Sequence, residues 1–285
     1  MSLRLIKLNS GYSIPSVGMG CYNLPPAQTS SIVYEACKLG YRHFDTAVLY
    51  HNEAEVAQGI SKYLQDHPGA KRLEFFYTTK VWDLQQGTAG TRKAVKDMVA
   101  KIGNLEYIDL LLLHSPLPGT KKRLESYAVL QEAVEAGHVR SVGVSNYGRH
   151  HVEELLQWSG LTHPPAVNQI EISPWVMRTE LAQWCLAQGI HVEAYAPLTH
   201  GNRLAAPEPG LALAAACKKY GKSPAQVLVK WSLSKGYIPL PKSKTPSRLK
   251  ENLEVNDFEL TPDEIAGIDQ PDSYDPTDWE CTDAP

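Results

Sequence analysis

Ile108-Asp109-Leu110-Leu111-Leu112-Leu113-His114 is the clearest indication of the fold in this chain of 285 residues. Apolar residues dominate it, and a histidine ends it. A strand covered on both faces reads as a nearly continuous apolar run, whereas a half-exposed strand alternates apolar and polar residues. The stretch therefore predicts a buried strand of a parallel sheet.

Short β-prone segments like this one alternate along the chain with longer segments of helical periodicity. The predicted strands are Gly18–Cys21, His43–Thr46, Phe75–Lys80, Ile108–His114, Ser141–Ser145, Val167–Ile172, His191–Tyr195 and Ile238–Pro241. The predicted helices are Ser30–Leu39, Glu53–Leu64, Gly90–Ile102, Lys122–Ala136, His150–Trp158, Thr179–Ala187 and Pro224–Leu233, with an extra helix at Pro246–Leu253 after the last strand. Strands that are each followed by a helix predict a closed parallel (β/α)8 TIM barrel.

A doubly wound open sheet is the alternative for such a chain. That fold predicts a fingerprint of three glycines after the first strand, which lets the backbone approach a pyrophosphate. The first predicted strand contains Gly18 and Gly20, but the third glycine is lacking. The closed barrel is therefore the better prediction.

Segments outside the strand and helix pattern are expected at three places. Arg4–Leu8 and Tyr12–Val17 predict an N-terminal β-hairpin, because Asn9 and Gly11 tolerate the positive φ of a tight turn. Leu198–Gly210 is a long loop after a strand, which places it on the catalytic face of a barrel. The acidic tail Gln270–Pro285 is expected to be mostly irregular. No Pro/Gly-rich linker divides residues 1–285, so one domain is predicted.

Composition and charge exclude several classes of protein. The formal net charge is -3, so no overall positive field attracts nucleic acid or an anionic membrane. The five cysteines are odd in number and include no CxxC pair, which argues against a disulfide framework or a metal site. No segment is apolar enough for a signal peptide or a membrane span, so we expect a cytoplasmic location and no obligatory protein partner.

Polar residues gather where the predicted strands end. Asp45, Lys80 and His114 each end a strand, and Tyr50 follows Asp45 by five residues. Singly, each has an ordinary explanation: a helix cap, a solvated lysine, a polar strand end and a packing aromatic. Together, at one rim of a barrel, they are more typical of an active site.

These four side chains suit proton donation to a developing alkoxide. A free tyrosine has a pKa of about 10, and a nearby ammonium is expected to lower it. Asp45 would keep Lys80 charged and in place. His114 would orient a carbonyl oxygen, so Tyr50 is the predicted proton donor.

With these motifs the sequence resembles the aldo-keto reductase family over nearly its whole length. The matching motifs are Gly40–Ala47 with Tyr50, Thr79–Trp82, Asp109–His114, Gly143–Tyr147, Asn168–Glu171, Ala194–Leu198 and Pro241–Ser243. The resemblance implies NADPH-dependent reduction of small aldehydes or ketones, with α-keto esters and amides among the candidates. It also implies a catalytic tetrad of Asp45, Tyr50, Lys80 and His114.

The resemblance also implies a cofactor site. Ser145, Asn146 and Gln169 match residues that hydrogen-bond the nicotinamide carboxamide, and Tyr195 matches the aromatic residue that stacks on the ring. The residues that match the adenosine 2′-phosphate and adenine site are Lys242, Ser243, Arg248, Glu251 and Asn252. Independently of the resemblance, cations and a hydroxyl before a helical segment suit a phosphate, and an arginine there favours NADP over NAD.

Substrate residues are less well matched. Tyr22 and Trp82 match aromatic positions of the pocket, but Ser115 follows the catalytic histidine where many relatives have tryptophan. Tyr274 and Trp279 are the large aromatic residues of a short tail. A more open pocket is expected, and no substrate is carried over from a relative.

Two other functions remain as hypotheses. An aldolase-like barrel would form a Schiff base at Lys80, although pairing with Asp45 would keep that amine protonated. A binding or regulatory protein would keep the barrel and NADPH but do little chemistry, and the complete tetrad argues against it.

Overall fold

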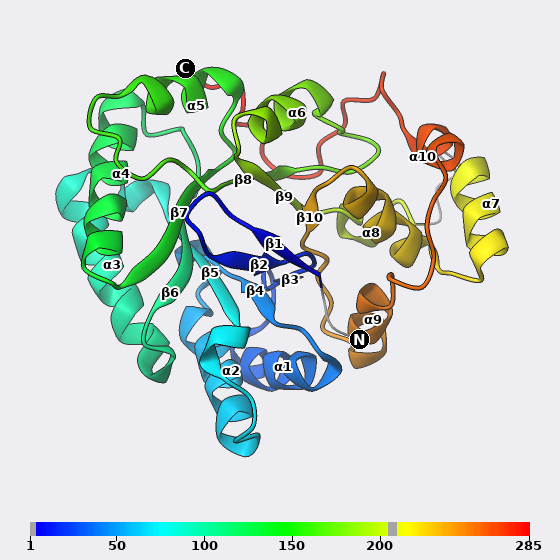
Figure 1. The fold of residues 1–285 in the computed structure, drawn as a ribbon, viewed down its shortest axis with the longest axis horizontal. Coiled ribbons are helices and arrows are strands. Elements are labelled where there is room, and N and C mark those ends of the chain that lie inside the picture. Colours follow the sequence, from blue (N-terminus) through cyan, green and yellow to red (C-terminus); the bar gives the residue numbers. More distant parts are fainter. Residues whose placement is uncertain (1–3, 205–209) are drawn as a thin grey trace.

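The computed structural model describes residues 4–204 and 210–285 and has the predicted barrel (Figure 1). Its sheet has eight strands in the order β10-β9-β8-β7-β6-β5-β4-β3, and each neighbouring pair is parallel. The strands are β3 (Met19–Gly20), β4 (His43–Asp45), β5 (Phe76–Val81), β6 (Ile108–Leu113), β7 (Val139–Ser145), β8 (Val167–Glu171), β9 (His191–Tyr195) and β10 (Ile238–Pro239). Every residue of β6 is buried, as its apolar run predicts.

The first and last strands close the barrel through backbone hydrogen bonds. The amide of Gly18 donates to Pro239 O at 3.0 Å, and that of Gly20 donates to Pro241 O at 3.2 Å. A Cβ on Gly20 would lie 3.1 Å from Leu240 O. These glycines therefore permit strand contact, a role different from that of the dinucleotide fingerprint.

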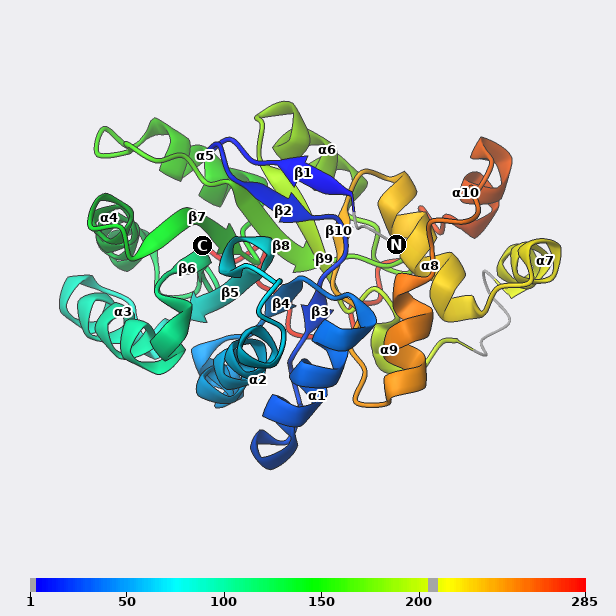
Figure 2. The same cartoon turned by 60° about the horizontal axis from the view of Figure 1, so that its bottom comes forward.

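Helices surround the barrel (Figures 1 and 2). Those that follow the strands are α1 (Pro26–Leu39), α2 (Glu53–Asp66), α3 (Thr88–Ile102), α4 (Thr120–Glu135), α5 (Arg149–Gln157), α6 (Thr179–Ala187), α8 (Pro224–Ser234) and α9 (Pro246–Leu253). Single 3-10 turns occur at η1 (Val48–Tyr50), η2 (Arg72–Glu74), η3 (Asp83–Gln85), η4 (Gly103–Leu105) and η5 (Thr199–Gly201). None of the described helices is long and apolar enough to cross a membrane.

Two helices were not predicted, α7 (Gly210–Tyr220) and α10 (Pro262–Ile268). The sequence carried a signal for α10, because Thr261 and Glu264 form a reciprocal capping box around Pro262. Helix α7 follows the predicted loop Leu198–Gly210, which opens with the turn η5 and whose residues 205–209 lie outside the described part of the chain.

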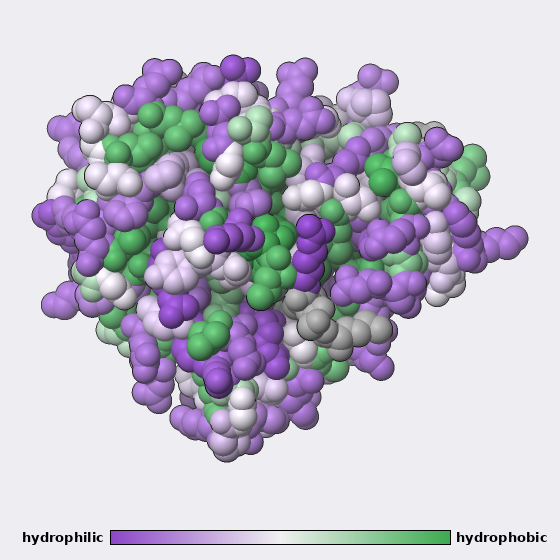
Figure 3. All heavy atoms as spheres, viewed as in Figure 1, coloured by the Kyte–Doolittle hydropathy of each residue, from purple (hydrophilic) through white to green (hydrophobic). Residues whose placement is uncertain are grey.

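The predicted hairpin forms from β1 (Leu5–Lys7) and β2 (Ser13–Pro15), which are antiparallel. It lies across the end of the barrel (Figures 1 and 2), where Leu8 and Ile14 pack on Phe76, Leu110 and other buried residues. On this face hydrophilic residues cover most of the edge and hydrophobic residues gather toward the middle (Figure 3). The hairpin therefore closes one end of the barrel and leaves the other end for the site.

Candidate active site

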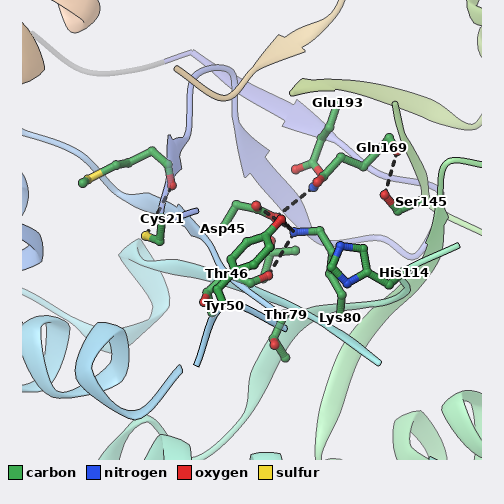
Figure 4. Close-up of polar contacts among 12 residues, drawn as sticks. Cys21, Asp45, Thr46, Tyr50, Thr79, Lys80, His114, Ser145, Gln169 and Glu193 are labelled. Atoms are coloured by element: carbon green, nitrogen blue, oxygen red, sulfur yellow. Dashed lines mark hydrogen bonds and ion pairs between the residues drawn. The ribbon is translucent and has the colours of Figure 1, made fainter. Parts of the chain in front are cut away.

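The four predicted tetrad residues meet at the carboxyl ends of the strands (Figure 4). Lys80 Nζ donates to both carboxylate oxygens of Asp45 at 2.8 Å and to Thr46 O at 2.9 Å. The same ammonium lies 3.4 Å from Tyr50 Oη. The His114 ring packs edge-on against the Tyr50 ring, with centroids 5.8 Å apart. A phenol, an ammonium, a carboxylate and an imidazole thus share one pocket.

The position of Tyr50 depends on a turn that the sequence analysis did not identify. Tyr50 ends η1, and the next residue, His51, has a left-handed φ of 55°. The Thr46 hydroxyl donates to Asn52 Oδ1 at 2.6 Å, and Asn52 Nδ2 donates to Cys21 O at 2.9 Å. Asn52 is fully buried, so these bonds hold the loop that carries the phenol.

Burial sets the protonation of two tetrad residues, Tyr50 and His114. It raises the pKa of Tyr50 well above 10, and the charges of Asp45 and Asp278 add to the rise. This direction is opposite to the expected one, because burial of the phenol penalises its charged form and the negative charge of Asp45 adds to that penalty. Burial, followed by the Lys80 charge, lowers the pKa of His114 well below 6.5. Tyr50 is therefore a protonated phenol and His114 a neutral imidazole near pH 7.

A cavity of about 840 Å³ contains most of the predicted site. It is lined by Tyr22, Asp45, Tyr50, Trp82, His114, Ser145, Asn146, Gln169, Tyr195, Lys242, Ser243, Arg248, Glu251 and Asn252. Lys80 does not line the cavity itself but contacts Asp45, which does. Ser115 is buried away from the cavity, where its hydroxyl donates to Asp83 Oδ2 at 2.7 Å.

The residues matched to the nicotinamide form a hydrogen-bonded group. Ser145 Oγ donates to Gln169 O at 2.8 Å, and Tyr195 Oη donates to Asn146 Oδ1 at 2.9 Å. Asn146 Nδ2 in turn donates to His114 O at 3.0 Å. This group and the tetrad are therefore coupled through backbone and side-chain contacts.

The C-terminal tail covers the site, a feature that the sequence does not predict. The Trp279 indole lies 5.6 Å from that of Trp82 and 5.8 Å from the His114 ring, measured between centroids. The buried Glu171 carboxylate of β8 accepts hydrogen bonds from the amides of Thr277 and Asp278 and from the Thr277 hydroxyl. Glu171 thus fixes the backbone that delivers Trp279 to the cavity.

The loop after β9 is tied to the tail. His200 Nε2 lies 3.0 Å from Asp278 Oδ2, and Arg203 forms an ion pair with Asp275. Both His200 and Asp278 line the cavity. Two segments far apart in the sequence therefore close over the same opening.

We expect this contact to weaken as pH rises. The hydrogen bond to Asp278 raises the pKa of His200 above 6.5, and partial burial opposes the rise. A histidine whose pKa is raised by folding contributes its full stabilisation below about pH 6.5 and loses it as pH rises through the folded-state pKa. Hydrogen exchange of the tail amides, corrected for intrinsic rates, should therefore accelerate with pH. His200→Gln should remove this dependence, and an unchanged dependence in that variant would contradict the assignment.

Known proteins are similar to this chain over nearly its whole length. A model of the Aldo/keto reductase family matches residues 16–272. An uncharacterized oxidoreductase of Saccharomyces cerevisiae is 53% identical over 283 residues, covering 99% of each chain. The methylglyoxal reductase DkgA of Escherichia coli is 35% identical, over 93% of this chain and 92% of that protein.

Solved structures agree with the sequence comparison. The aldo-keto reductase of Bombyx mori, in complex with NADP, superposes with a TM-score of 0.86 at 33% identity, over 94% of this chain and 92% of that chain. The aldo/keto reductase of Brucella melitensis gives a TM-score of 0.85 at 37% identity, over 94% of this chain and 98% of that chain. Together with the barrel fold, these matches show that the chain belongs to the aldo/keto reductase family.

Proposed function

We propose that this protein reduces the carbonyl group of small aldehydes or ketones to alcohols, with NADPH as cofactor and Tyr50 as proton donor. α-Keto esters and amides are among the candidate substrates. The observation that supports this most is the 3.4 Å contact between Tyr50 Oη and Lys80 Nζ at the wall of the cavity. The same cavity is lined by His114 and by the residues matched to the nicotinamide.

The cationic end of the cavity supports NADPH as the cofactor. Lys242, Lys244 and Arg248 line this end beside the start of α9. Among the described residues, the ion pair at the end of this helix joins Lys250 and Glu254 and does not involve these three cations. Burial, followed by repulsion from Lys244, lowers the pKa of Lys242. Cations that repel one another near a helix N-terminus suit an anion such as the 2′-phosphate of NADPH.

The tetrad would then act on the carbonyl oxygen. When bound, NADPH supplies the hydride that reaches the carbonyl carbon. The neutral imidazole of His114 donates a hydrogen bond to the oxygen, and Tyr50 transfers its proton to that oxygen as negative charge develops. The phenolate left behind is stabilised by Lys80, which Asp45 holds in place, and solvent returns the proton to Tyr50.

Arg248→Ala should reduce the preference for NADPH over NADH. The guanidinium pairs with a phosphate by charge-assisted hydrogen bonds, each stabilising by roughly 1.5–3 kcal/mol, so the Kd for NADPH should rise about 10- to 100-fold. The Kd for NADH should change little, because NADH has no 2′-phosphate. Fluorescence titration of both cofactors checks this, and an equal loss for both would contradict a phosphate role.

The reaction itself is tested by following NADPH oxidation against aldehydes, ketones, sugars, and α-keto esters and amides, with NADH in parallel. Turnover with at least one carbonyl class is expected. Tight NADPH binding without any turnover would favour a regulatory role. Borohydride trapping of an adduct at Lys80 would favour an aldolase, in which Lys80 Nζ would have to give up its hydrogen bonds to Asp45, Thr46 and Tyr50.

A further inference from the structure

A buried amide lies between two carboxylates beside the tetrad (Figure 4). Gln169 Nε2 donates to Asp45 Oδ1 at 2.8 Å and to Glu193 Oε2 at 2.8 Å. All three residues are at most 3% exposed. A primary amide has two N–H groups, so both are used by these carboxylates.

The orientation of this amide follows from charge. Reversing it would place Gln169 Oε1 against oxygens of both Asp45 and Glu193, a repulsion that a buried site does not screen. The two carboxylates therefore hold Nε2 inward. Oε1 is left as an acceptor, with no donor among the residues that the structure describes, on a side chain that lines the cavity.

Glu193 has its own partner below the tetrad. Its Oε1 lies 3.3 Å from His43 Nε2, close enough for an ion pair but not aligned as a hydrogen bond. Thr78 Oγ1 is also 3.3 Å from His43 Nε2, and the Phe76 ring packs edge-on against the imidazole. His43 and Glu193 are both fully buried, so the carboxylate is held at one place. Asp45 is held in the same way by Lys80.

We propose that Glu193 is a positioning residue that, together with Asp45, locks the Gln169 amide so that only its oxygen faces the cofactor. This inference rests on the proposed function, in which Gln169 contacts the nicotinamide carboxamide. A fixed acceptor favours a ring substituent that carries N–H groups. It disfavours one that offers only a carbonyl oxygen, because two acceptors then face each other without a proton.

The test compares binding of NADP⁺ with binding of its 3-acetylpyridine analogue, in which a methyl ketone replaces the carboxamide. Quenching of the fluorescence of the six tryptophans gives Kd without turnover. The wild-type protein should bind NADP⁺ about tenfold more tightly or better, the size of one unpaired buried acceptor. Glu193→Gln should reduce this ratio to about threefold or less, because the Gln169 amide, then held by the Asp45 carboxylate alone, can turn and donate to the ketone.

A matched control is Asp109→Asn. It removes another buried carboxylate of the barrel, which pairs with Arg72 and does not line the cavity, and it should keep the wild-type ratio. If Glu193→Gln does not fold, the double variant His43→Gln with Glu193→Gln replaces both members of this buried pair together and should give the same reduced ratio. The inference is overturned if the wild-type protein binds NADP⁺ and the analogue with nearly equal Kd, or if the ratio of the two Kd values is unchanged in the folded variant. Failure of the wild-type protein to bind NADP⁺ at all would instead refute the proposed function.

Discussion

Tyr50→Phe is expected to lower kcat by about 10³-fold, the size of a lost general acid. The variant lacks the hydroxyl 3.4 Å from Lys80 Nζ, so no phenol proton is available to the developing alkoxide. The ring should stay in place, because it packs on Tyr22 at a centroid distance of 5.0 Å and on His114 at 5.8 Å. The Kd for NADPH should therefore change less than about twofold, since the ring and its packing are retained.

Single-turnover measurements of NADPH oxidation separate this effect from slow product release. Tyr34→Phe is the matched control, because it removes a hydroxyl that bonds Asp66 on the outer surface, far from the cavity. It should leave kcat close to that of the wild-type protein. Turnover of Tyr50→Phe within a few-fold of wild type would reject Tyr50 as the proton donor.

Lys80→Met is expected to destabilise the protein and to abolish turnover. Removing one member of a buried ion pair leaves the other without compensation, which typically costs about 3–5 kcal/mol. Here the stranded group is Asp45, which is 3% exposed and whose oxygens both accept from Lys80 Nζ. Methionine fills much of the space of the lysine stem, so loss of packing adds little.

A double variant separates the effect on stability from the effect on catalysis. Adding Asp45→Asn to Lys80→Met removes the stranded charge, so most of the lost free energy of unfolding should return. Turnover should stay abolished, because no ammonium is left to stabilise the Tyr50 phenolate. Urea unfolding and kcat, measured on both variants, check this. A Lys80→Met protein as stable as wild type would show that Asp45 does not depend on this ion pair.

The barrel and the meeting of Asp45, Lys80 and His114 at one rim could be predicted because they follow from local patterns and one topological rule. The apolar run Ile108–Leu113 predicts a buried strand from its own residues. Parallel strands of a barrel all end at the same rim, so strand-end positions alone bring Asp45, Lys80 and His114 together. Helix α10 was not predicted, although Thr261 and Glu264 of its capping box are present in the sequence. The local sequence was therefore sufficient to predict this helix.

Other site residues carried no such local signal. Glu193 lies within β9, where one acidic residue in a short strand looks the same whether it faces solvent or the barrel interior. Asn52 looked like an ordinary polar residue before a helix, yet it is fully buried and holds the turn of Tyr50. The partners that give these residues a role lie far away in the chain.

From the residues alone follow the eight strands with the helices after them, the family, and the types of polar residue that gather at the strand ends. The tertiary structure alone decided that the tail lays Trp279 against Trp82 and that Gln169 is clamped between Asp45 and Glu193. It also reversed the expected direction of the Tyr50 pKa. The physical reason is that desolvation and Coulomb energy depend on the atoms that surround a group in space. Those atoms belong to strands, a turn and a tail that only folding brings together.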